Sequence, residues 1–118
     1  MITAVHALIY SKQADAVREF LRDTLGLPHV DSGGGWLIFA LPPAELGVHP
    51  TDGDGRHELF LMCDDLDATM AELAAKGVEL TGEVHDQEWG RETAIRLPGG
   101  DLLGLYQPKH AAAYNLPR

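Results

Sequence analysis

The chain repeats its own pattern along most of its length. The stretch HALIYSKQADAVREFL (residues 6–21) returns with small changes as HELFLMCDDLDATMAEL (residues 57–73). Further along, FALPPAELGVHP (39–50) is answered by IRLPGGDLLGLYQP (95–108). An internal repeat of about fifty residues is typical of one supersecondary unit used twice, because a single unit leaves one apolar face uncovered.

Length and repeat together predict the domain organisation. A chain of 118 residues has room for one domain with a modest core. We expect that domain to span residues 1–110, with its two halves at about 3–50 and 56–108. The remaining residues, 111–118, have no counterpart in the first half and form a C-terminal tail.

Each half has the pattern of a strand, a helix and three further strands. In the first half an alternating strand covers about residues 3–10, and a helix follows that Ser11 can cap and Gly26 can end. The three glycines of DSGGGW (31–36) predict a turn, and the stretches WLIFAL and AELGVH predict strands.

The second half follows the same order. A helix begins at Asp64 or Asp65 and stops at Gly77, and three strands are expected in VELTGEV, TAIRL and DLLGLYQP. The fold class predicted from the sequence is therefore α+β, with two βαβββ repeats.

Strand alternation separates the residues of the last strand in each half. Leu103 and Leu105 have the phase of residues that pack on helices, whereas Gly104 and Tyr106 have the opposite phase. In AELGVH the same alternation sets Leu46 and Val48 apart from a second group: Glu45, Gly47 and His49.

Charge and cysteine content narrow the functional classes. Nine Lys and Arg against eighteen Asp and Glu give a net charge of −9, which disfavours nucleic acid and suits a cationic or neutral ligand. Cys63 is the only cysteine and lies in an apolar run, so we expect an inert buried thiol. The start MITAVHALIY resembles neither a signal peptide nor a membrane span, and we expect a cytoplasmic protein without membrane contact.

In the order of these features the chain resembles the vicinal oxygen chelate superfamily, which includes glyoxalase I, extradiol dioxygenases, fosfomycin-resistance enzymes and bleomycin-binding proteins. The resemblance covers about residues 3–108 and rests on the first-strand histidines, DDLDATMAELAAKGVEL, EWGR and LPGGDLLGLYQP. It implies two curved mixed sheets that face each other around a cleft, with helices outside. It also implies a homodimer.

The resemblance implies a divalent metal held by the first and last strands of both halves. His6 and His57 match the two first-strand positions. Gly104 and its repeat mate Gly47 stand where carboxylate ligands are expected in the last strands. The sequence thus supplies half of the ligand set.

A metal site would need a third ligand, since enzymes generally hold iron, zinc or nickel through about three side chains. His49 is the candidate, although its place before Pro50 at a strand end favours a solvated rim position over ligation. With Fe, Ni, Mn or Zn bound, the protein would be a lyase, isomerase or dioxygenase, with Glu45 moving protons and Tyr106 donating to an oxyanion.

Without a metal, the same cleft would be a binding site. Its candidate ligand-binding residues are Trp36, Gly47, His49, Trp89, Gly104 and Tyr106. Both tryptophans could equally pack in the core. Since both carboxylates are missing and the chain is acidic, we favour a protein that binds or sequesters a cationic or aromatic metabolite and requires no cofactor, over the metal-dependent enzyme.

Overall fold

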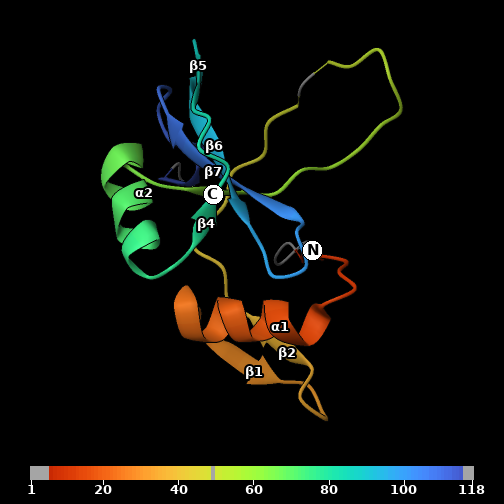
Figure 1. Cartoon of the computed structure of the whole chain (residues 1–118). Helices are drawn as coiled ribbons and strands as arrows, with labels where there is room; N and C mark the ends of the chain where they lie inside the picture. Colours follow the sequence, from red (N-terminus) through yellow and green to blue (C-terminus); the bar gives the residue numbers. More distant parts are fainter. Residues whose placement is uncertain (1–5, 49, 116–118) are drawn as a thin grey trace.

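The structure, a computed structural model, describes residues 6–48 and 50–115 (Figure 1). Its second half is a complete βαβββ unit with one added strand. The strands are β3 (Phe60–Met62), β4 (Glu79–Leu80), β5 (His85–Gln87), β6 (Gly90–Arg96) and β7 (Leu102–Pro108), and the helix is α2 (Leu66–Ala75). The strand order is β3-β7-β6-β4, and β5 pairs with β6. Because β3 is parallel to β7 and the other pairs are antiparallel, the sheet is mixed, as predicted.

Helix α2 covers one face of this sheet. Leu103 and Leu105 of β7 are buried there together with Ile95 of β6. Leu66 and Leu73 of α2 belong to the same apolar cluster. The predicted phase of the last strand is therefore confirmed, and the opposite face carries Gly104 and Tyr106.

The ends of α2 are fixed by side chains and by a glycine. Asp65 is the N-cap, and its carboxylate accepts a hydrogen bond from the amide of Ala68 at 3.0 Å. The side chain of Gln107 in β7 accepts a second bond from the amide of Leu66 at 2.8 Å. After the helix, Gly77 adopts a positive φ of 81°, which a residue with a side chain rarely tolerates. Both predicted helix limits are confirmed.

The first half contains a helix and a hairpin. Helix α1 (Ala14–Glu19) continues into one π-helical segment, η1 (Phe20–Thr24), and β1 (His29–Asp31) pairs with β2 (Leu37–Phe39). The turn expected in DSGGGW joins the two strands. Ser11 does not cap the helix as predicted, because its hydroxyl accepts the amide of Gln13 in a preceding turn.

Two predicted strands of the first half are irregular where the structure describes them. Residues 6–10 and 40–48 are extended segments outside the sheets, while residues 3–5 and His49 lie outside the described part. A strand needs a neighbouring backbone to hydrogen-bond, and among the residues that the structure describes the β1–β2 hairpin pairs only with itself. Leu46 and Val48 are left 90% and 94% exposed.

The two halves share one core. Val17 of α1 is buried in the same cluster as Leu66 and Leu73 of α2. In Figure 1, α1 lies with the hairpin at one end of the larger sheet, near the turn between β6 and β7. Within the described residues, no helix combines the length and the apolar character needed to cross a bilayer.

Candidate functional site

The face of the larger sheet opposite α2 is open, and we call it the open face. Register places Phe60 of β3 beside Gly104 of β7, and Met62 beside Tyr106. On the other side of β7, Ala94 and Glu92 of β6 pair with Gly104 and Tyr106. Because paired residues share a face of the sheet, these six side-chain positions form one surface.

Aromatic rings lie directly on two glycines of the open face, Gly104 of β7 and Gly90, which has the phase of Glu92 in β6. A β-carbon at residue 104 would collide with the ring of Phe60, and one at residue 90 would collide with the ring of Tyr106. The absence of a side chain at Gly104 and Gly90 is therefore what lets the rings lie against the backbone. The ring centroids of Phe60 and Tyr106 are 6.1 Å apart in an edge arrangement.

Tyr106 is held in place from two sides. Its hydroxyl donates a hydrogen bond of 2.7 Å to the carbonyl of Trp89, in the turn between β5 and β6. The imidazole of His110 lies on its other side, with the ring centroids 5.9 Å apart. The open face thus carries an ordered aromatic group with a fixed hydroxyl.

Carboxylates border Tyr106. Burial raises the pKa of the Tyr106 hydroxyl above its usual value of 10.0, and the charges of Glu45 and Glu92 raise it further. Glu45 comes from the irregular segment 40–48, so the first half contributes to the edge of this surface. The electrostatic field there favours positive charge.

Glu45 is bound by the end of the chain. Its side chain is only 15% exposed. One oxygen, Oε2, accepts the backbone amide of Ala113 at 2.8 Å, and the other, Oε1, lies 3.5 Å from Nε2 of His110. The sequence suggested a proton-transfer role for Glu45, but here the carboxylate holds the C-terminal segment.

The structure brings together some of the predicted ligand-binding residues and separates others. Gly104, Tyr106 and Trp89 lie at the open face. Trp36 is in the hairpin of the first half, where the guanidinium carbon of Arg18 lies 4.7 Å from its ring centroid. Gly47 is exposed in the irregular segment, and His49 lies outside the described residues.

The predicted metal ligands do not form a site in the described part of the chain. His6 and His57 are exposed and lie outside the strands. If the alternation of β3 is continued back along the chain, residue 58 has the phase of Phe60 and residue 57 that of Leu61, which faces α2. Among the described residues, no three His, Cys, Asp or Glu side chains lie close enough to hold an ion. The Phe60 ring also fills the space that a carboxylate at position 104 would need, so these residues do not fit the implied metal.

Sequence reasoning missed Phe60, Met62 and His110. The signal for the first two was the alternation in LFLMC, in which Leu59, Leu61 and Cys63 pack towards the core. His110 had no such signal, because its position depends on where the chain turns after β7.

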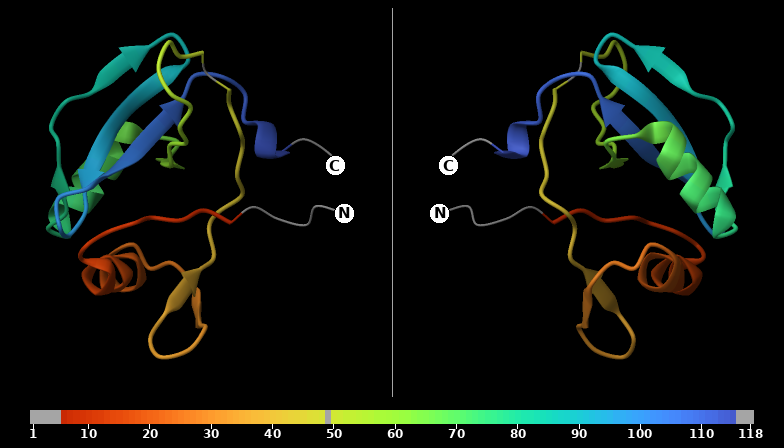
Figure 2. Two further views of the ribbon diagram at one scale, coloured as in Figure 1. Left: turned by 90° about the vertical axis from the view of Figure 1, so that its right-hand side faces the viewer. Right: turned by 90° about the vertical axis from the view of Figure 1, so that its left-hand side faces the viewer.

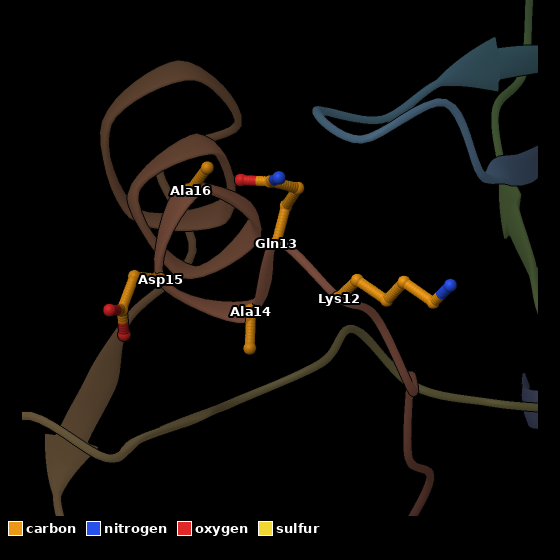
Figure 3. A pocket seen from close by; sticks show the side chains of 5 residues that line it. All are labelled: Lys12, Gln13, Ala14, Asp15 and Ala16. Atoms are coloured by element: carbon orange, nitrogen blue, oxygen red, sulfur yellow. The ribbon is translucent and has the colours of Figure 1, made fainter.

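Two hollows lie away from the open face and are less suited to selective binding. One, of about 210 Å³, lies at the start of α1 (Figure 3) and is lined by Lys12, Gln13, Ala14, Asp15 and Ala16. Figure 3 shows the side chains of Lys12, Gln13 and Asp15 pointing in different directions, so these groups do not converge. The second, of about 330 Å³, is an apolar groove on the β1–β2 hairpin.

Comparison with known proteins identifies the family. The model of the Glyoxalase/Bleomycin resistance protein/Dioxygenase superfamily matches residues 3–105. Among solved structures, TnmS3, an antibiotic binding protein from Streptomyces sp. CB03234, is 28% identical with a TM-score of 0.66, and the alignment covers 92% of this chain and 98% of that one. A superfamily member from Sphaerobacter thermophilus DSM 20745 is 25% identical with a TM-score of 0.61, covering 90% and 98%.

A lactoylglutathione lyase from Agrobacterium tumefaciens shares the fold at 19% identity, with a TM-score of 0.63 and coverage of 90% and 94%. The comparison with curated sequences gave no match. The family match spans most of the chain, and the solved relatives are similar over nearly their whole length. The chain therefore belongs to the glyoxalase/bleomycin resistance protein/dioxygenase superfamily.

Proposed function

We propose that the protein binds a planar aromatic cation on the open face and does not transform it. The observation that carries this proposal is the packing of Phe60 on Gly104 beside Tyr106. In the family, position 104 is where the resemblance implies a metal-ligating carboxylate. In this chain the ring of Phe60 lies on position 104, and this apolar, aromatic surface suits the stacking of a planar ligand.

The charge of the surface supports a cationic ligand. Glu45 and Glu92 act on the Tyr106 hydroxyl from the edge of the open face. The whole chain carries −9, so its field also attracts cations over a distance. A positive group beside the aromatic rings would gain from both the carboxylates and the ring faces.

A relative with a binding function supports the same proposal. TnmS3 is described as an antibiotic binding protein and is 28% identical to this chain. The lyase relative is 19% identical and supports only the fold. We therefore place binding ahead of catalysis, with no cofactor required.

Isothermal titration calorimetry with ethidium, a planar aromatic cation, tests the proposal. We expect binding, and weaker binding of phenanthridine, the uncharged parent ring. Phe60→Leu and Tyr106→Leu should each weaken ethidium binding about three- to tenfold, because an aromatic contact contributes about 0.5–1.5 kcal/mol. Trp36→Leu, on the hairpin, is the matched aromatic control and should change nothing.

Metal analysis separates this proposal from the metal-dependent enzyme. Protein purified without chelator would be titrated with divalent iron, nickel, manganese and zinc, beside a His57→Ala variant. Stoichiometric metal that is lost in His57→Ala would overturn the proposal. Failure of wild-type protein to bind either ring compound would also count against it.

We further propose that the protein is a cytoplasmic homodimer. The exposed Leu46 and Val48 support this assembly, because a second copy would cover them.

A further inference from the structure

We propose that the C-terminal segment, residues 109–115, is a latch that occupies Glu45 and must release it before a cationic ligand can bind fully. The inference rests on the proposed function, since it concerns access to the same open face. It assigns a role to the tail, for which the repeat offers no counterpart.

The latch is attached at both ends. At its start, the amide of Lys109 donates to the carbonyl of Trp89 at 2.9 Å, and the Lys109 ammonium pairs with Asp86 of β5. Further on, His110 and the amide of Ala113 bind the two oxygens of Glu45. Figure 2 shows the chain turning away from β7 and placing η2 (Ala113–Asn115) beside the segment of residues 40–48.

The contacts at Glu45 are those that a ligand would replace. The latch brings the Ala113 amide to one carboxylate oxygen and Nε2 of His110 to within 3.5 Å of the other, and the ring centroids of His110 and Tyr106 are 5.9 Å apart. A planar cation on the open face needs the same two partners, an aromatic neighbour and a carboxylate. The imidazole of His110 therefore occupies the position that we expect for the charged part of such a ligand.

Competition follows from this overlap. While the latch is closed, the Glu45 side chain is largely buried, and its two oxygens lie against the Ala113 amide and the His110 imidazole. A bound cation would reach the carboxylate by displacing His110 and the Ala113 amide. The contacts at Asp86 and Trp89 lie at the start of the segment and can keep it attached while its far end opens.

A full-length double variant tests the latch. His110→Ala removes the imidazole, and Ala113→Pro removes the amide donor at the first position of η2, where proline is tolerated. We expect ethidium to bind about three- to tenfold more tightly to this variant, since one hydrogen bond and one contact between an imidazole and a carboxylate contribute about 1 kcal/mol together. In a Glu45→Ala background the same pair of substitutions should have no effect.

The matched control is His29→Ala. His29 lies on the β1–β2 hairpin, where its ring centroid is 5.8 Å from that of Phe39, so this variant loses an imidazole and its aromatic contact away from the open face. Its ethidium affinity should equal that of the wild type.

A second measurement does not depend on a ligand. Hydrogen exchange of the Ala113 amide should be faster in Glu45→Ala than in wild-type protein, and unchanged in Glu83→Ala. If the release variant and the wild type bind ethidium equally, the latch is wrong and the binding function stands. If neither binds, the proposed function fails, and unchanged Ala113 exchange in Glu45→Ala would reject the latch as well.

Discussion

Tyr106 is the residue at which the aromatic and acidic features of the open face meet. Its pKa is raised by burial and then by Glu45 and Glu92, so its hydroxyl should ionise above pH 10. An absorbance titration should show a tyrosine step above pH 10 that is missing in Tyr106→Phe. Glu92→Gln should lower the Tyr106 midpoint; a Tyr106 midpoint at or below pH 10 would contradict this account.

The same shift has a consequence for stability. A group whose pKa is raised by folding contributes its full stabilisation below its unfolded pKa, here about 10. The stabilisation is lost as pH rises through the higher folded value. We expect the free energy of unfolding to fall more steeply above pH 10 in wild-type protein than in Tyr106→Phe, measured by urea denaturation.

Cys63 should be unreactive in the folded protein. Burial raises the pKa of its thiol, and this outweighs the hydrogen bond with Thr69, which lowers the pKa; the nearby carboxylates of Asp64 and Asp65 raise it further, so little thiolate is present near neutral pH. Alkylation by iodoacetamide at pH 7.5 should be slow in buffer and fast in denaturant. Equal rates in the two conditions would show that the thiol is accessible and ionised.

At the scale of elements, one side chain of β7 holds the start of α2. Gln107 accepts the amide of Leu66, and Leu66 is fully buried. Gln107→Leu should lower the free energy of unfolding by about 1–2 kcal/mol, because the helix loses a cap and an amide loses its partner. Gln87→Leu, in the exposed strand β5, is the control and should change it by less than about 0.5 kcal/mol.

The second half was largely predictable because its signals are local. Asp65, Gly77 and the alternation of residues 102–106 fix a helix and a strand without reference to distant residues. The open face was predicted only in part, because His57 matches a metal-ligand position in the first strand of this half, and that match determined which residues of the strand were expected to face the cleft. A shift of one residue exchanges the two faces of a strand, and this concealed Phe60.

The irregular segments of the first half could not have been recognised from the sequence. Residues 6–10 and 40–48 have apolar content suited to strands, but a strand also needs a pairing partner that sequence periodicity does not supply. The position of Glu45 beside His110 likewise depends on how two distant segments meet.

At the scale of the whole molecule, the exposed apolar side chains argue for a second copy. Leu46 and Val48 are almost fully exposed, and Tyr10 is 86% exposed. We expect a dimer in sedimentation velocity at micromolar concentration. Leu46→Glu with Val48→Glu should weaken it at least about tenfold, since each removes an apolar contact.

Leu102→Glu is the control for this variant, because Leu102 is also exposed but lies on the larger sheet. Two copies that each carry a net charge of −9 repel each other, and salt screens this repulsion, so added salt should strengthen the dimer. A monomer at every concentration tested would contradict the assembly.

The packing of Phe60 on Gly104 also constrains the order in which mutations at these two positions can be accepted. A side chain introduced at 104 first would collide with the ring, whereas shortening residue 60 first opens the space that a later side chain could occupy. The two positions are thus epistatic, and the path towards a carboxylate at 104 has a preferred direction. Libraries that vary either position alone would miss the functional combinations that need both.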